Sequence, residues 1–209
     1  MSSFIADILG KIRSFFSFGK KTEEPIKTTT EPATVKVVEP PKKIEPPPTQ
    51  PPKPPAVKPT IAKDPKIEKL YPGLREHAYN FMEDARKINA YLFCGVRTFE
   101  EQAGLYAQGR SKPGIIITNA GPGYSYHNYG LAIDVVFKNK NGWTWNSERW
   151  NELGRLGNGR AFEWGGSWTK FPDRPHFQII YKQPIGKLLA IYNQRKQLAD
   201  VWRYLDTLV

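Results

Sequence analysis

A proline-rich stretch between Pro25 and Pro59 divides the chain into parts that cannot share one core. It holds 12 of the 19 prolines, in runs such as PPKKIEPPPTQPPKPP. Such a sequence buries too little apolar surface to fold and favours extended polyproline conformations. We therefore expect three parts in this 209-residue chain: an N-terminal segment of residues 1–20, a disordered Pro/Lys-rich linker over 21–63, and one folded domain over 64–209.

The N-terminal segment predicts an amphipathic helix. Its apolar residues recur at helical spacing: Phe4, Ile5, Ile8, Leu9, Ile12, Phe15 and Phe16. Charged residues interrupt it, so its continuous apolar run is too short to span a bilayer. It also lacks the pattern of a cleavable secretory signal. We favour an interfacial membrane helix or a docking helix for a partner over a helix that folds back on the domain, because the linker separates it from any core.

The net charge of +11 and the pI near 9.6 indicate attraction to polyanions, among them nucleic acid, anionic cell-wall polymers and lipid headgroups. No helix-turn-helix, zinc-finger or aromatic RNA-reading signature accompanies the charge, so we expect no nucleic-acid partner. Cys94 is the one cysteine. An internal disulfide is therefore impossible, and we interpret this residue as a buried apolar side chain. We expect a monomer.

Residues 64–209 read as a single α+β domain with a small antiparallel sheet flanked by helices. Helices are predicted over 74–90, 98–108 and 147–157, with one or two more over 184–208; strands are predicted over 91–96, 131–137 and 175–181. Thr98 and Glu101 form a Thr-x-x-Glu capping box at the start of the second helix. Gly and Pro mark 109–123 as a loop.

Two segments carry residues that suggest a metal site. Asp134 stands inside the apolar run 131–137, where an ionised carboxylate is costly unless it is paired or bound to a metal. His127 precedes this strand, and Gly130 permits a close backbone approach at the junction. His176 begins the strand 175–181, where alternation puts Gln178 on the same face. Two histidines and one carboxylate leave a zinc coordination position open, as catalytic sites do.

Two further residues complete a candidate active site. Asp173 stands in a turn fixed by Pro172 and Pro175, within reach of a water at the metal. Arg97, at a strand-to-helix junction, suits a substrate carboxylate or the oxyanion of a tetrahedral intermediate. Each residue taken alone is more often structural, as we assume for His77 on the first helix. The argument rests on their combination, because two of the chain's 3 histidines fall in these segments.

The run S-x-H-x-x-G-x-A-x-D followed by D-x-P-H-F resembles the M15 zinc peptidases. The stretch 96–178, with RTFEEQ, LYAQGR, KPG, ITNA and SYHNYGLAID, is most similar to endolysin-type L-alanyl-D-glutamate endopeptidases. This implies a Hedgehog/D-Ala-D-Ala peptidase-like fold, Zn²⁺ held by His127, Asp134 and His176, Asp173 as general base, and Arg97 for substrate binding or transition-state stabilisation. We add Ser125 and Gln102, from the same motifs, as candidate substrate-binding residues. Gln178 departs from the family, where Glu is frequent.

The resemblance predicts a bacteriolytic hydrolase that cuts peptidoglycan stem peptides. The alternatives are a D-alanyl-D-alanine carboxypeptidase and a non-catalytic zinc-stabilised wall-binding module, against which Asp173 argues. Without a cleavable signal, a phage or prophage lysin fits best, made in the host cytoplasm or carried in a virion and acting on the cell wall. The N-terminal helix then holds the protein at a membrane while the linker lets the domain reach the wall.

Overall fold

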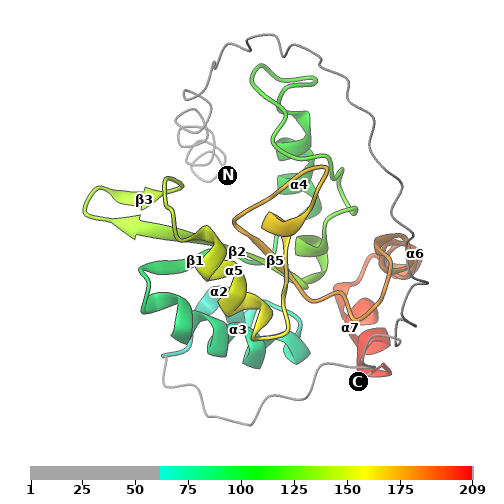
Figure 1. Cartoon of the computed structure of the whole chain (residues 1–209). Helices are drawn as coiled ribbons and strands as arrows, with labels where there is room; N and C mark the ends of the chain where they lie inside the picture. The colour runs from blue at the N-terminus through cyan, green and yellow to red at the C-terminus, as the bar shows by residue number, and fades with distance from the viewer. Residues whose placement is uncertain (1–61, 209) are drawn as a thin grey trace, which may run out of the picture.

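The structure, a computed structural model, describes residues 62–208 (Figure 1). The predicted N-terminal helix and most of the linker lie outside these residues. The described elements are α2 (Pro65–Glu68), α3 (Pro72–Arg86), β1 (Ala90–Cys94), α4 (Phe99–Ala107), η1 (Tyr126–Tyr129), β2 (Ala132–Asn139), β3 (Gly142–Thr144), α5 (Trp150–Asn158), β4 (Glu163–Trp164), η2 (Gly165–Ser167), β5 (His176–Gln178), α6 (Ile185–Arg195) and α7 (Leu198–Asp206). No helix in this part of the chain has the length and apolar character needed to cross a membrane.

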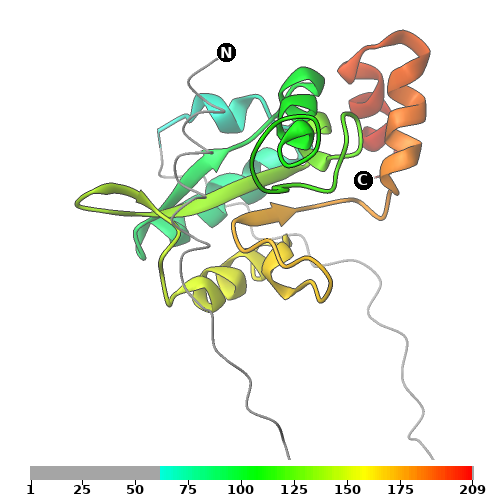
Figure 2. The ribbon, with the colours of Figure 1, turned by 90° about the horizontal axis from the view of Figure 1, so that it is seen from above.

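A five-stranded antiparallel sheet forms the centre of the domain. Its order is β1-β2-β5-β4, and β3 pairs with β2 as a hairpin. The hairpin projects from one end of the molecule, and α6 and α7 lie at the opposite end (Figures 1 and 2). The predicted α+β class, with a small antiparallel sheet and flanking helices, is confirmed.

Strand β2 separates the core from the face that carries the candidate site. Ile133, Val135 and Phe137 belong to the hydrophobic core, together with the apolar side chains of α3. Because side chains alternate along a strand, Asp134 and Lys138 lie on the other face. The sheet is thus covered by a helix on one side and remains available for chemistry on the other.

The edge strand β1 contains an irregularity next to Asp134. Leu92 pairs with Val135 and Cys94 with Asp134, so Phe93 is an extra residue in the register. A bulge of this kind places two successive side chains of one strand on the same side of the sheet, and bulges often lie beside active sites. The sequence contains no turn residue that would have revealed it.

The local signals at the site are found as predicted. Thr98 caps α4, and Thr98 and Glu101 make both hydrogen bonds of the capping box. Gly130 ends η1 at φ 72°, and a Cβ on it would lie 2.7 Å from the backbone nitrogen of Tyr71. No other residue fits that approach, which attaches the segment before β2 to the start of α3.

Several elements differ from the predictions. Helix α3 ends at Arg86, because Asn89 adopts φ 60° and cannot continue a right-handed helix. Strand β5 ends at Gln178, because Tyr181 and Lys182 also have positive φ and turn the chain. The short strands β3 and β4 were not predicted; with three and two residues they are too short for a hydrophobic pattern.

Candidate metal centre and active site

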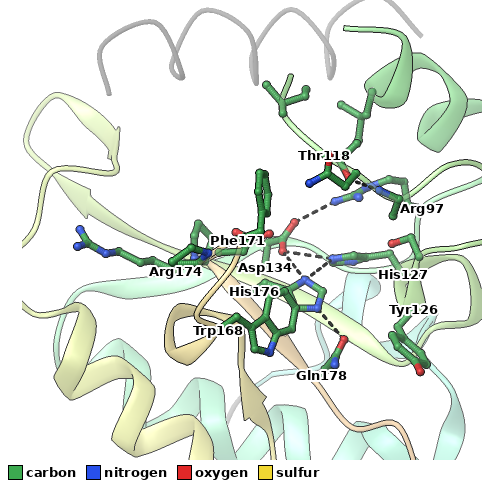
Figure 3. Close-up of a pocket in the computed structure, with 18 of the residues that line it drawn as sticks. Arg97, Thr118, Tyr126, His127, Asp134, Trp168, Phe171, Arg174, His176 and Gln178 are labelled. Carbon is green, nitrogen blue, oxygen red and sulfur yellow. Dashed lines mark hydrogen bonds and ion pairs between the residues drawn. The ribbon is translucent and has the colours of Figure 1, made fainter. Parts of the chain in front are cut away.

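Three side chains from different elements point to one place in the domain (Figure 3). His127 comes from η1, Asp134 from β2 and His176 from β5, and pairing of Asp134 with His176 across β2 and β5 brings two of them together. His127 Nε2 lies 3.2 Å from His176 Nδ1 and 3.2 Å from Asp134 Oδ1. His176 Nδ1 lies 3.5 Å from Asp134 Oδ1.

These three atoms fit one face of a tetrahedral zinc site. Zinc binds nitrogen and oxygen ligands at about 2.0–2.2 Å, so neighbouring ligand atoms of a tetrahedron lie about 3.3–3.6 Å apart. The edges of 3.2, 3.2 and 3.5 Å come close to that spacing. None of these three residues occupies the fourth corner of the tetrahedron.

The second nitrogen of each imidazole has its own hydrogen-bond partner. His127 Nδ1 lies 2.8 Å from the carbonyl oxygen of Gly95, which only accepts, so Nδ1 carries the proton and Nε2 is left as a lone-pair donor. His176 Nε2 lies 3.0 Å from Gln178 Oε1. The tautomer that a metal ligand needs is therefore set for His127 by the backbone and for His176 by a side chain.

A further acid orients that side chain. Gln178 Nε2 donates to Glu163 Oε2 at 2.9 Å, and Trp168 Nε1 donates to Glu163 Oε1 at 2.7 Å. The carboxylate accepts only, so the amide nitrogen of Gln178 must face it and the amide oxygen must face His176. Hydrogen-bonded partners of this kind orient metal ligands.

Arg97 lies on the other side of Asp134. Its Nη2 donates to Asp134 Oδ2 at 3.0 Å, and its Nη1 donates to Gln102 Oε1 at 2.8 Å. Gln102 is fully buried and donates through Nε2 to the carbonyl oxygen of Ala120. One carboxylate oxygen of Asp134 thus faces arginine and the other faces the two histidines.

Cys94 is the other possible ligand, and no sequence signal marked it. Its sulfur lies within 4.8 Å of ligand atoms of His127 and Asp134. Burial raises the pKa of this thiol to about 11, and Arg97 Nη2 lies 3.8 Å from Sγ. A protonated thiol beside a guanidinium is a poor ligand. His176, whose Nδ1 lies 3.2 Å from His127 Nε2 and whose Nε2 has an orienting partner, is the better third member.

Burial and neighbouring charges set the protonation of these groups. Burial lowers the pKa of His127 to about 4, so its imidazole is neutral at pH 7. Burial alone would raise the pKa of Asp134, but His127, His176 and Arg97 hold it well below the ordinary value. Burial and the charge of Asp134 together raise the pKa of Asp173 to about 6, against the opposing effects of His176 and Arg97. Asp173 is thus ionised at pH 7 yet binds a proton readily.

The candidate ligands open into a pocket of about 850 Å³. Asp173 lines it, and the backbone N–H of Asp173 donates to Gly165 O at 2.9 Å. A Cβ on Gly165 would lie 2.7 Å from Asp173 O, so this close approach needs glycine. The remaining lining residues include polar ones, Ser125, Thr118 and Asn119, and aromatic ones, Phe93, Trp145 and Trp168.

The structure thus brings six of the seven predicted site residues to one pocket: Arg97, Ser125, His127, Asp134, Asp173 and His176. Gln102 lies behind Arg97 and does not line the pocket. His77, which we interpreted as structural, contacts the carbonyl oxygen of Arg160 through Nδ1 at 3.2 Å. The contribution of Glu163 was not predicted, because nothing in its neighbourhood of the sequence distinguishes it.

Comparison with known proteins identifies relatives of this chain. A family model described as D-alanyl-D-alanine carboxypeptidase, of the peptidase M15 group, matches residues 118–179. The peptidoglycan L-alanyl-D-glutamate endopeptidase CwlK of Bacillus subtilis (strain 168) is 38% identical over 128 residues, which cover 56% of this chain and 77% of that protein. The L-alanyl-D-glutamate peptidase of Listeria phage A118 is 29% identical over 144 residues, 64% of this chain and 48% of the phage protein.

Among solved structures, the L-Ala D-Glu endopeptidase ChiX of Serratia marcescens aligns with a TM-score of 0.42 and 21% identity, over 56% of this chain and 85% of that one. The matched sequence relatives place the chain in a class of metal-dependent peptidases. The chain belongs to the peptidase M15 family.

Proposed function

We propose that this chain is a zinc-dependent endopeptidase that hydrolyses the L-alanyl-D-glutamate bond of peptidoglycan stem peptides. The observation that carries the proposal is the triangle formed by His127 Nε2, His176 Nδ1 and Asp134 Oδ1, with edges of 3.2, 3.2 and 3.5 Å. The names of the bacterial and phage relatives support the choice of bond.

In this proposal the three triangle residues hold zinc and leave one position open for water or substrate. Zinc supplies Lewis acidity there: it lowers the pKa of a water and polarises the scissile carbonyl. The protein keeps the two imidazoles in the required tautomers through Gly95 and Gln178. Neutral imidazoles and an ionised carboxylate are the forms that bind a metal.

Asp173 serves as the general base. It takes a proton from the attacking water and later delivers it to the amine of D-glutamate as the peptide bond breaks. Its pKa of about 6 suits both steps at neutral pH, because the carboxylate is ionised before the reaction and holds the proton long enough to transfer it.

Arg97 acts at the same place through its charge. Its bonds to Asp134 and Gln102 hold the guanidinium beside the metal ligands at the pocket wall. A fixed cation in a buried site stabilises the negative oxygen of a tetrahedral intermediate, or binds a substrate carboxylate. Gln102 acts on the substrate only through Arg97, whereas the buried Ser125 lines the pocket itself.

A D-alanyl-D-alanine carboxypeptidase is the second candidate, because the matching family model bears that description. It uses the same metal and base and differs in the bond that it cuts. A wall-binding module with a structural metal is less favoured, since such a module has no use for Asp173 in the pocket.

For its place of action we propose a phage or prophage lysin that acts on the cell wall. The net charge of +11 suits anionic wall polymers. Three statements stay predictions: residues 1–20 bind a membrane, residues 21–63 are a linker, and the chain is monomeric. Deleting residues 1–20 should abolish binding to liposomes of anionic lipid without changing the hydrolysis of purified peptidoglycan.

Mass spectrometry of the products formed from purified peptidoglycan by the full chain with zinc tests the function. New L-alanine C-termini and D-glutamate N-termini are expected; released D-alanine would identify the carboxypeptidase instead. The Asp173→Ala variant should keep stoichiometric zinc and lose hydrolysis. If this variant hydrolyses the wall at the normal rate, Asp173 is not the base.

A further inference from the structure

A group of aromatic side chains lies beside the metal site on the same side of the sheet. Trp143 pairs with Lys138, which is four residues along β2 from Asp134 and shares its face. Phe93, Trp143 and Trp145 form this group, which we call the aromatic wall. Phe93 and Trp145 line the pocket that contains Asp134, so the pocket runs without interruption from the candidate metal ligands to the wall.

The backbone irregularity in β1 accounts for the position of Phe93. Cys94 pairs with Asp134, and the extra residue before it is Phe93. Strict alternation would turn one of these two side chains toward the core, whereas the bulge lets both reach the site side. Cys94 lies by the metal ligands and Phe93 lines the pocket. The same bulge therefore shapes both ends of this part of the pocket.

The aromatic wall is held in place by its own contacts. The Phe93 ring meets Trp143 edge-on at 5.2 Å between centroids and Trp145 at 5.4 Å. Lys138 Nζ lies 4.3 Å above the Trp143 ring. Trp150 Nε1 donates to the backbone oxygen of Trp145 at 3.2 Å. Phe93 and both tryptophans are nevertheless only half-buried, so part of each side chain remains exposed.

We propose that the aromatic wall is a sugar-binding subsite, which takes the muramyl sugar of the glycan strand. This inference rests on the proposed function. In peptidoglycan the L-alanine of the stem is joined through a lactyl group to N-acetylmuramic acid, so the sugar lies about two residue lengths, roughly 7 Å, before the bond that is cut. Phe93 lies in the bulge opposite Asp134, and Trp143 pairs with Lys138 four residues further along β2, so the wall extends from the metal ligands to about 13 Å at the rise of a β-strand.

The chemistry of the two ends of the pocket assigns the direction of the substrate. A pyranose ring presents C–H groups on its faces, which pack against aromatic rings, and hydroxyls at its edge. Beyond the cut bond the stem carries the carboxylate of D-glutamate and a charged diamino acid. The side of the pocket with Thr118, Asn119 and Ser125 offers hydroxyl and amide groups to that charged part. The aromatic wall offers ring faces for the C–H groups of the sugar and indole N–H donors for its hydroxyls.

Two substrates that differ only before L-alanine test the subsite. One is the disaccharide-tripeptide, with N-acetylglucosamine and N-acetylmuramic acid joined to L-Ala-D-Glu-diamino acid; the other is the N-acetylated tripeptide, which also lacks a charged amine there. The full chain with zinc should cleave the first with a kcat/KM roughly tenfold higher, a gain typical of one or two aromatic contacts. Trp145→Ala should reduce this ratio to about two, and Trp145→Phe should retain most of it.

Tyr124→Ala is the matched control, because Tyr124 is an exposed aromatic residue that lines the pocket and does not belong to the wall. It should leave the ratio near the wild-type value. The proposal is overturned if the wild-type ratio is near one, if Trp145→Ala lowers kcat/KM for both substrates equally, or if Tyr124→Ala removes the preference instead. Because the ratio compares two substrates on one enzyme preparation, partial misfolding of a variant does not change it.

Failure of the proposed function is visible separately. If neither the disaccharide-tripeptide nor the N-acetylated tripeptide is cut between L-alanine and D-glutamate, the endopeptidase assignment fails. Quenching of tryptophan fluorescence by the free disaccharide then decides the subsite. Saturable quenching that Trp145→Ala weakens at least fivefold upholds a sugar site, and its absence in the wild-type protein rejects one.

Discussion

The two faces of strand β2 differ in what they require of the sequence. On one face Ile133, Val135 and Phe137 are buried among other apolar side chains, where hydrophobicity and approximate size are the main demands. On the other face Asp134 is an ionised group that is nearly as buried, and it needs specific partners on both of its oxygens. Adjacent residues of one strand therefore serve stability and chemistry separately.

The face with Asp134 is also the more vulnerable one. Removing one partner from a buried ion pair leaves the other charge without compensation, at a cost of about 3–5 kcal/mol. Truncating a side chain on the core face loses the transfer free energy of the deleted atoms and leaves a cavity. It leaves no charge unpaired in a medium of low dielectric constant. A substitution at Asp134 should hence cost both metal binding and stability, whereas one on the core face should cost stability alone.

The largest effect is expected for Asp134→Ala. Zinc binding should be lost, and kcat/KM on peptidoglycan should fall by at least about three orders of magnitude, equivalent to roughly 4 kcal/mol of transition-state stabilisation. Metal analysis of the purified variant together with a turbidity assay on cell walls measures both quantities. A variant that retains one zinc per chain would contradict the ligand assignment, and chelation of the wild-type protein should reproduce the loss of activity.

Ile133→Ala, one residue away, should lower stability and leave metal binding intact. Ile133 is fully buried in the core, so its truncation should lower the free energy of unfolding by about 2–4 kcal/mol. Zinc content and kcat/KM of the folded fraction should stay within about twofold of the wild type, because the side chain points away from the site. Urea denaturation and metal analysis give the two readings, and a parallel loss of zinc would show that the two faces are not independent.

This separation was predictable from the sequence in part. The alternation around Asp134 and the pairing of a loop histidine with a strand carboxylate are properties of nearby residues, and so is the capping box at Thr98. The bulge at Phe93 and the route from His176 through Gln178 to Glu163 depend on strands distant in the chain. No local pattern encodes them, because β4 has only two residues and nothing in the sequence distinguishes Glu163 from other acidic residues.

The route through Gln178 allows a finer test of the site face. Gln178→Leu should weaken zinc binding by about 10- to 100-fold, because His176 loses the acceptor that fixes its tautomer. Competition with a zinc chelator measures the affinity, and an unchanged value would mean that the backbone alone orients His176. The double variant Gln178→Glu with Glu163→Gln is the matched control: it exchanges acid and amide, keeps an acceptor facing His176, and should retain affinity within a few-fold.

The smallest effect expected is a pH dependence that distinguishes the base from the ligands. Asp173, whose pKa burial raises to about 6, accepts a proton only when ionised. As pH falls below that value, kcat/KM should drop about tenfold per pH unit, with the midpoint at or below pH 6 because bound zinc lowers the pKa of a nearby carboxyl group.

The rate at each pH is measured with the zinc content of the same sample, since protonation of the histidines also releases metal. If the rate falls only where zinc is lost, the ligands and not Asp173 set the acid limb; if it falls while zinc is still bound, and Asp173→Glu moves its midpoint, the pocket carboxylate sets it.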